Sequence, residues 1–141
     1  MQFELQASQP KEFALHFRIP AWAEGATLSV NGKQWTAPTI PGSFAAIPRT
    51  WKSGDRVDLH LPMKTRLEPI DANHPDIAAL LCGPLVLFGI QANGKPITRE
   101  QLLAATQTNP TTWQAQSGSG PIILRPFISI TNERYSTYFH L

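Results

Sequence analysis

The chain has 141 residues, enough for one ordinary hydrophobic core, and only 16% of them are charged. Its 12 basic and 10 acidic residues are spread along the sequence, so no basic stripe exists that could bind a nucleic-acid backbone. The longest apolar stretch, residues 77–90, is interrupted by Gly83-Pro84 and is too short to cross a bilayer as a helix. We therefore expect no nucleic-acid partner and no membrane span, and no signal peptide pattern precedes the first strand to indicate a compartment.

Short strands separated by tight turns are predicted through the first half of the chain. Apolar side chains recur at every second position in residues 13–19, which is the period of a half-buried strand. Asn31-Gly32 predicts a hairpin with a type I′ turn, because both residues tolerate a positive φ. Ser53-Gly54-Asp55 predicts a second reversal. The other expected strands cover residues 3–7, 27–30, 34–36, 44–47 and 57–61.

The second half has longer apolar runs and one helix signal. Residues 77–81 and 85–90 are expected to be the most buried strands, with a kink or sheet crossing at Gly83-Pro84 between them. Thr98 and Gln101 have the spacing of a capping box, which predicts one short helix. Residues 117–121 have the composition of a flexible loop, and residues 122–124, 127–130 and 135–141 return to strand-like sequence.

Regularly spaced short strands with turns between them are typical of an all-β fold. We expect an antiparallel β-sandwich, jelly-roll-like, with one short helix. No linker or repeat interrupts the sequence, so residues 1–141 are predicted to form a single domain.

Metal binding finds little support in the sequence. Cys82 is the only cysteine and lies within an apolar run, where a buried structural role is expected rather than a reactive thiolate. His16 and His60 are predicted to project from the outer face of strands, His74 lies in a loop and His140 lies near the C-terminus. Because this spacing does not bring them together, we expect solvated histidines and no metal site in this chain.

A series of motifs resembles one enzyme family. The segments are Phe13 to Ala23, Val30-Asn31-Gly32, Gly42-Ser43-Phe44, Arg49-x-Trp51-x-x-Gly54-Asp55, Leu61-Pro62-Met63, residues 79–87, Pro126-Phe127 and residues 133–139. Their order and spacing resemble the bacterial β-L-arabinofuranosidases of glycoside hydrolase family 127, formerly a domain of unknown function. The resemblance implies a longer enzyme with an (α/α)6 catalytic barrel followed by β-sandwich domains, and it places this chain in the C-terminal β-sandwich region. Met1 directly before a strand-like segment also fits a boundary inside a longer protein, although a truncated gene would look the same.

The resemblance also implies where the chemistry lies. The family's zinc-bound cysteine nucleophile belongs to the barrel, so zinc is expected only in that missing domain and Cys82 does not correspond to the nucleophile. A conventional glycosidase needs two facing carboxylates. The candidates here follow turns, face outward from strands or lie in loops, and no catalytic pair is expected among them: Asp55, Asp58, Glu68, Asp71, Asp76 and Glu133.

The expected function is therefore that of a non-catalytic accessory domain that packs against the helical barrel and stabilises it. The alternative is a carbohydrate-binding module that stacks exposed tryptophan rings on a glycan, for which Trp22 and Trp113 are the candidates. Trp22 and Trp51 stand at positions where a large ring usually covers the edge of the core instead. An apolar patch left uncovered by the missing barrel is expected to favour self-association.

Overall fold

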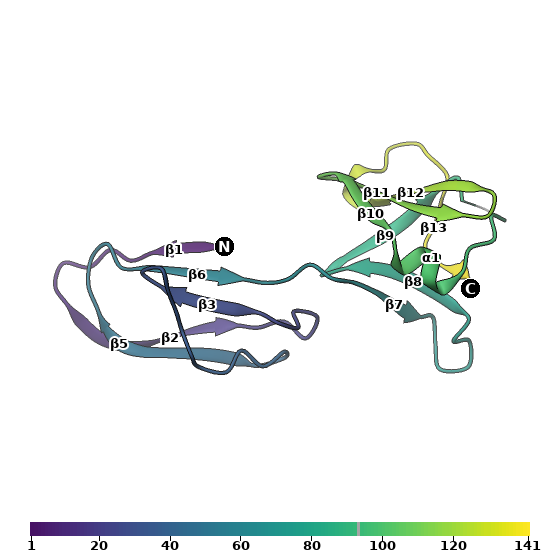
Figure 1. Ribbon diagram of the computed structural model, residues 1–141. Helices are drawn as coiled ribbons and strands as arrows, with labels where there is room; N and C mark the ends of the chain where they lie inside the picture. Colours follow the sequence, from purple (N-terminus) through teal and green to yellow (C-terminus); the bar gives the residue numbers. More distant parts are fainter. Residues whose placement is uncertain (93) are drawn as a thin grey trace. The chain divides into compact units, whose positions relative to one another are not determined.

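The computed structural model describes residues 1–92 and 94–141, and every strand pairing in these residues is antiparallel (Figure 1). Together with one short helix, α1 (Arg99–Leu103), the strands confirm the predicted all-β class. The described chain divides into two compact units, Met1–Met63 and Lys64–Leu141, called unit 1 and unit 2 below. Each unit contains its own cluster of buried residues. The sequence predicts a single domain with one core over the same residues.

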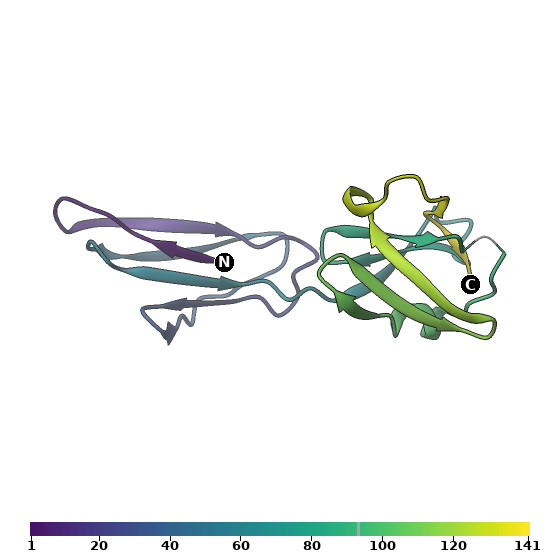
Figure 2. The same ribbon diagram turned by 90° about the horizontal axis from the view of Figure 1, so that it is seen from above.

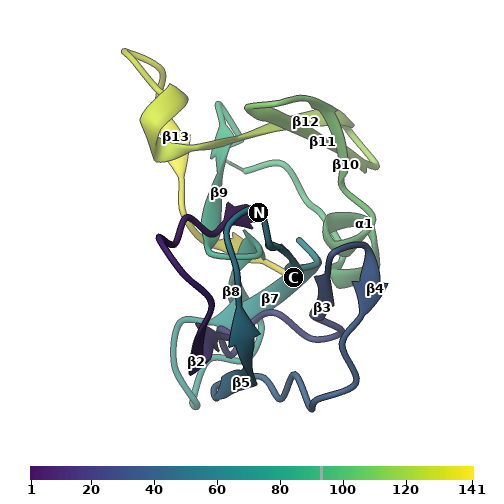
Figure 3. The same ribbon diagram turned by 90° about the vertical axis from the view of Figure 1, so that its left-hand side faces the viewer.

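Unit 1 is a small two-layer sandwich. One layer is a four-stranded sheet in the order β1-β6-β3-β4, and the other is the two-stranded sheet β2-β5. Figure 3 shows β2 beside β5, and these two strands pair over eight residues without a register shift. The strand bounds are β1 (Gln2–Glu4), β2 (Lys11–Arg18), β3 (Thr27–Val30), β4 (Lys33–Gln34), β5 (Phe44–Trp51) and β6 (Arg56–His60).

The core of unit 1 forms where alternate residues of the two layers face each other. Ile47 and Trp51 of β5 and Val57 of β6 have no solvent-exposed surface. The alternation predicted for residues 13–19 is present, since Phe17 and Ile19 are buried while His16 and Arg18 are exposed.

The predicted Asn31-Gly32 hairpin is confirmed. Val30 pairs with Lys33, and Asn31 and Gly32 have φ values of 50° and 77°. These are the two positive φ angles that a type I′ turn requires, so the Asn-Gly pair suits the backbone of this turn.

Unit 2 is built on the hairpin of β8 (Ile77–Cys82) and β9 (Leu85–Ile90). The prediction of a kink or sheet crossing at Gly83-Pro84 is wrong, because Cys82 pairs with Leu85 across a two-residue turn. Gly83 has a φ of 54°, which suits the first central position of a type II′ turn, and proline fits the second. The expected burial is confirmed most clearly for β8, in which Ala78 and Leu80 have no exposed surface.

Beyond the turn, β8 and β9 diverge, and the C-terminal segment fills the space between them. Tyr135 of β13 (Tyr135–Ser136) pairs with Ile90 of β9, whereas Phe139 of β14 (Phe139–His140) pairs with Ala78 of β8. The other strands flank this pair: β7 (Thr65–Pro69) joins β8, and β12 (Gly120–Pro126), β11 (Thr112–Ser117) and β10 (Thr106–Asn109) follow β9.

Several local predictions for unit 2 need correction. Residues 117–121, predicted to be a flexible loop, form a tight turn between β11 and β12, drawn in green in Figure 2. In this turn the Ser117 hydroxyl donates a hydrogen bond to the carbonyl of Gly120 at 2.7 Å. Residues 127–130, expected to be a strand, contain the 3₁₀ turn η1 (Phe127–Ser129). The capping box of α1 is confirmed by both of its hydrogen bonds, between Thr98 and Gln101.

Candidate functional site

Asp55, the most buried acidic residue among the candidates, has a structural role in unit 1. It is 1% exposed, and its carboxylate accepts hydrogen bonds from Asn31 Nδ2 at 2.8 Å and from the Lys52 N–H at 2.9 Å. Arg49 lies 3.7 Å away and stacks on Trp51, with 4.9 Å from its guanidinium carbon to the ring centroid. The Asn31 hydrogen bond is the main reason that the pKa of Asp55 is lowered. The motif residues Asn31, Arg49, Trp51 and Asp55 thus join the β3–β4 hairpin turn to the turn that connects β5 of one sheet with β6 of the other.

The other candidate carboxylates are dispersed over both units. Asp58 pairs with Arg56 at 3.0 Å, and Glu68 lies 3.7 Å from Arg66. Asp71 accepts hydrogen bonds within its own loop, and that from His74 is the main cause of its lowered pKa. Asp76 is exposed, and its backbone carbonyl accepts from the N–H of Leu141.

The histidines and the cysteine follow the sequence analysis. All four histidines are exposed: His16, His60, His74 and His140. Cys82 is 4% exposed in the core of unit 2, and burial raises the pKa of its thiol. Within residues 1–92 and 94–141, no three His, Cys, Asp or Glu side chains are grouped in a way that could hold a metal ion. No helix in the described part of the chain has the length and apolar character needed to span a membrane.

The two tryptophans proposed for sugar stacking differ in exposure. Trp113, on β11, is 4% exposed and packs in the core of unit 2, so the expected exposed ring is absent at this position. Trp22 is half-buried and packs against the core of unit 1. It lines a shallow depression of about 360 Å³ together with Met1, Leu59, His60, Leu61 and Met63. Trp51 has no exposed surface, which confirms the core role considered for it.

The most conspicuous surface of unit 2 is aromatic, and the sequence analysis missed it. The Phe88 ring centroid lies 5.8 Å from that of Phe127 and 5.2 Å from that of Tyr135. Tyr135 stands edge-on to both other rings, at 82° and 85°. Phe127 is 61% exposed, Tyr135 44%, and Ile128, which follows Phe127, 87%. Phe88, Phe127, Ile128 and Tyr135 are called the aromatic surface below.

An ion pair holds the segment that presents the aromatic surface. Glu133 accepts from Arg125 Nη1 of β12 at 2.8 Å and from the N–H and hydroxyl of Thr131 at 2.8 and 3.0 Å. The backbone N–H of Thr131 is the largest reason that the pKa of Glu133 is lowered to about 2. A carboxylate with so low a pKa is unsuited to general acid catalysis, but it can fix the 127–135 segment.

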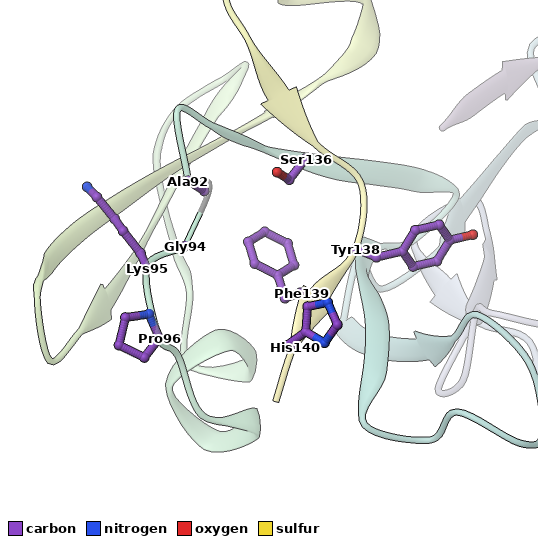
Figure 4. Close-up of a pocket in the computed structure, with 8 residues that line it drawn as sticks. All are labelled: Ala92, Gly94, Lys95, Pro96, Ser136, Tyr138, Phe139 and His140. Carbon is purple, nitrogen blue, oxygen red and sulfur yellow. The ribbon is translucent and has the colours of Figure 1, made fainter.

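Unit 2 also has a depression of about 470 Å³, shown in Figure 4. Its lining includes Lys95 and Pro96 on one side and Tyr138, Phe139 and His140 on the other. Lys95 Nζ donates to the carbonyl of Pro121 at 3.2 Å. The Tyr138 hydroxyl points away from the depression in Figure 4, so the polar groups around it do not converge on one point.

These features define a class of protein before any comparison. The described carboxylates are dispersed or held in structural hydrogen bonds, and several large apolar side chains are exposed. The chain is an all-β protein with surfaces suited to contact.

Comparison with known proteins shows a family likeness for unit 1. Residues 1–63, which coincide with unit 1, match the family model of the β-L-arabinofuranosidase GH127 middle domain. The family model describes the middle domain of the GH127 enzyme. The sequence motifs predict instead a place in the C-terminal β-sandwich region of such an enzyme. The comparison with curated proteins found no match.

Solved structures resemble the chain over nearly its whole length. A GH127 β-L-arabinofuranosidase from Geobacillus stearothermophilus T6 superimposes with a TM-score of 0.73 and 20% identity over 97% of this chain. A protein described as a glycoside hydrolase has a TM-score of 0.69 and 20% identity over 98% of the chain, and a GH127 β-arabinofuranosidase has 0.69 and 17% over 99%. At these identities the likeness establishes the fold. The chain spans only 28%, 29% and 29% of those three proteins.

Proposed function

We propose that this chain is a non-catalytic accessory part of a GH127 β-L-arabinofuranosidase-like enzyme. The observation that carries the proposal is the combination of a family match over unit 1 with a fold match over 97% of the chain but only 28% of a solved GH127 enzyme. The dispersed carboxylates support the same reading, because none of them is paired with a second carboxylate across a site. In the intact enzyme, the proposed reaction is hydrolysis of terminal β-L-arabinofuranosides in an (α/α)6 barrel that holds the zinc and the cysteine nucleophile.

The proposed partner of this chain is that barrel, and its proposed contact is the aromatic surface. Phe127 at 61% exposure and Ile128 at 87% expose large apolar side chains from a segment that Glu133 and Arg125 hold in place. A fixed segment loses little conformational entropy when a partner covers it, which favours binding. Contiguous exposed apolar groups of this kind mark contact surfaces in soluble proteins.

Titration of the chain with the catalytic barrel of its parent enzyme tests the partner. We expect saturable binding, and we expect Ile128→Asp or Phe127→Ser to weaken it at least tenfold, because each removes an exposed apolar anchor. Ile40→Ser is the matched control, since Ile40 is 60% exposed in unit 1 and lies outside the aromatic surface. The partner proposal fails if the wild-type chain does not bind, or if Ile40→Ser weakens binding as much as Ile128→Asp.

Turnover of an aryl β-L-arabinofuranoside by the purified chain tests the non-catalytic character. No turnover is expected between pH 4 and 9, with or without zinc and reductant. Turnover that co-purifies with the chain and is lost in Glu133→Gln would assign an active site to unit 2 instead.

Carbohydrate binding is the second candidate function, and Trp22 is the residue that favours it. Its half-buried indole lines the depression with His60, an arrangement that offers an apolar ring face beside a polar group. We expect Trp22→Ala to abolish retention on an arabinan affinity gel while circular dichroism stays unchanged. Equal retention of wild type and Trp22→Ala would remove Trp22 from this function.

A further inference from the structure

The turn between β3 and β4 carries an Asn-Gly pair, Asn31-Gly32, whose side-chain amide is chemically labile. In an unfolded chain the Gly32 backbone nitrogen can attack Cγ of Asn31, because glycine has no side chain to obstruct the approach. The nitrogen gives up its proton, the Cγ–Nδ2 bond breaks and ammonia leaves, which closes a succinimide ring. Water then opens the ring at either carbonyl and yields aspartate or isoaspartate. The net reaction converts an amide and water to an acid and ammonia.

In folded unit 1, both ends of the Asn31 amide are held by hydrogen bonds. Nδ2 donates to the Asp55 carboxylate at 2.8 Å, and Oδ1 accepts from the Arg56 N–H at 2.8 Å. The backbone N–H of Asn31 also donates to the Arg56 carbonyl at 2.9 Å. The side chain is therefore directed at Asp55 and Arg56, and ring closure onto the Gly32 nitrogen requires that these hydrogen bonds break.

Exclusion of solvent does not protect this amide. Asn31 and Gly32 are both exposed. Among the described residues, and apart from the chain neighbours of Gly32, no heavy atom lies within 4 Å of the position that a Cβ on Gly32 would take. Water and hydroxide therefore reach the turn, so the hydrogen bonds of Asn31, rather than burial, are what keeps the amide from reacting.

We propose that Asn31 is a protected deamidation site, which is inert while unit 1 is folded and reacts when unit 1 opens. The rate of deamidation in the native protein is then the rate in the unfolded chain multiplied by the fraction of molecules in which the Asn31 hydrogen bonds are broken. Modified Asn31 accumulates only in molecules that have opened, so the turn keeps a covalent record of unfolding.

The products of the reaction do not fit the folded turn. Aspartate at position 31 replaces the Nδ2 donor with an oxygen that faces the carboxylate of Asp55, which is 1% exposed. Two carboxylates this close cannot both stay ionised without a large cost. Isoaspartate adds a carbon to the backbone of a two-residue turn and disturbs the pairing of Val30 with Lys33. A single opening event can thus become a permanent loss of unit 1.

Peptide mapping by mass spectrometry tests the protection. The full chain is incubated in mildly alkaline buffer with and without concentrated urea, and the conversion of Asn31 is followed over time. We expect conversion in urea and a rate at least about tenfold lower without it. Mapping separates this site from Asn93-Gly94, the other such pair in the sequence. Equal rates in the two conditions, or no conversion in urea, would overturn the proposal.

Two matched core variants test whether opening of unit 1 controls the reaction. Trp51→Ala removes a fully buried ring from unit 1, so it is expected to accelerate conversion of Asn31 in the absence of urea. Trp113→Ala removes a ring that is 4% exposed from the core of unit 2 and is expected to leave the rate unchanged. Equal acceleration by both variants, or by neither, would overturn the assignment of control to unit 1.

A product mimic tests the consequence of the reaction. Asn31→Asp and Asn31→Gly both lose the donor to Asp55, but only Asn31→Asp adds a second carboxylate there. We expect Asn31→Asp to lower the thermal transition of unit 1 further than Asn31→Gly does. An Asn31→Asp variant as stable as the wild type would overturn the claim that the product does not fit the folded turn.

Discussion

Unit 1 and unit 2 use the carboxylates of their motifs in different ways. In unit 1 the carboxylate of Asp55 is 1% exposed and binds Asn31 and Lys52, so it joins two turns to the core. In unit 2 the carboxylate of Glu133 has a side-chain exposure of 28% and binds Arg125, so it fixes a segment that carries exposed rings. In both units, therefore, the carboxylate of the motif fixes the backbone segment to which it is hydrogen-bonded. What differs is whether the fixed segment packs against the core or carries exposed side chains.

The largest expected effect tests whether the two cores are independent. Trp51→Ala removes a ring with no exposed surface from the core of unit 1, and large-to-small changes of this kind cost about 3–5 kcal/mol. Because unit 2 has a separate buried cluster, we expect calorimetry to show a lowered transition for unit 1 and an unchanged one for unit 2. One cooperative transition that shifts as a whole would instead support a single domain over 1–141.

The next effect belongs to unit 2. A Cβ at Gly89 would lie 2.7 Å from the Phe139 ring and 2.8 Å from the Ala92 methyl group, where β13 and β9 pair. We expect Gly89→Ala to destabilise unit 2 by about 1–3 kcal/mol through overpacking. Gly118→Ala is the control, since nothing lies within 4 Å of the added carbon, and chemical denaturation compares the two. Equal stability of both variants would show that the packing around Phe139 is loose.

A smaller effect in unit 1 isolates the polar contact between the turns. Asn31→Gly keeps the positive φ of 50° accessible but removes the hydrogen bonds to Asp55 and from the Arg56 N–H. We expect a loss of about 1–2 kcal/mol in the free energy of unfolding. No loss in urea denaturation would mean that the turn is held by its backbone alone.

The smallest effect is local and depends on pH. The pKa of Glu133 is lowered from 4.5 to about 2, so the folded 127–135 segment favours the ionised carboxylate. This stabilisation is complete above pH 4.5 and is lost as the pH falls toward 2. We expect amide exchange in residues 127–135 to accelerate over that interval, and Glu133→Gln to remove the pH dependence. Acceleration at the same pH in Glu133→Gln would assign it to another group.

The sequence predicts the elements whose geometry is local. Asn31-Gly32 and the Thr98–Gln101 capping box are confirmed, because a positive φ or a reciprocal pair of hydrogen bonds is determined within a few residues. The kink predicted at Gly83-Pro84 is wrong, although the order glycine before proline is itself a sequence pattern that fits a type II′ turn.

The remaining features depend on residues far apart in the chain. β7, β10 and β11 were not predicted, since β7 is held by pairing with β8 and β10 consists of exposed polar residues. The aromatic surface forms because β9, which carries Phe88, pairs with β12 and places the Phe88 ring beside Phe127 and Tyr135. No local sequence pattern encodes these contacts between distant residues. Two adjacent apolar residues, Phe127-Ile128, beside a proline were the available sign that one of them is exposed.

Amide hydrogen exchange of this chain, alone and with the catalytic barrel proposed as its partner, tests the accessory role most directly. We expect the barrel to slow exchange in residues 126–135, around the aromatic surface, and to leave exchange in the Asn31–Gly32 turn unchanged. Unchanged exchange in residues 126–135 on addition of the barrel would contradict it.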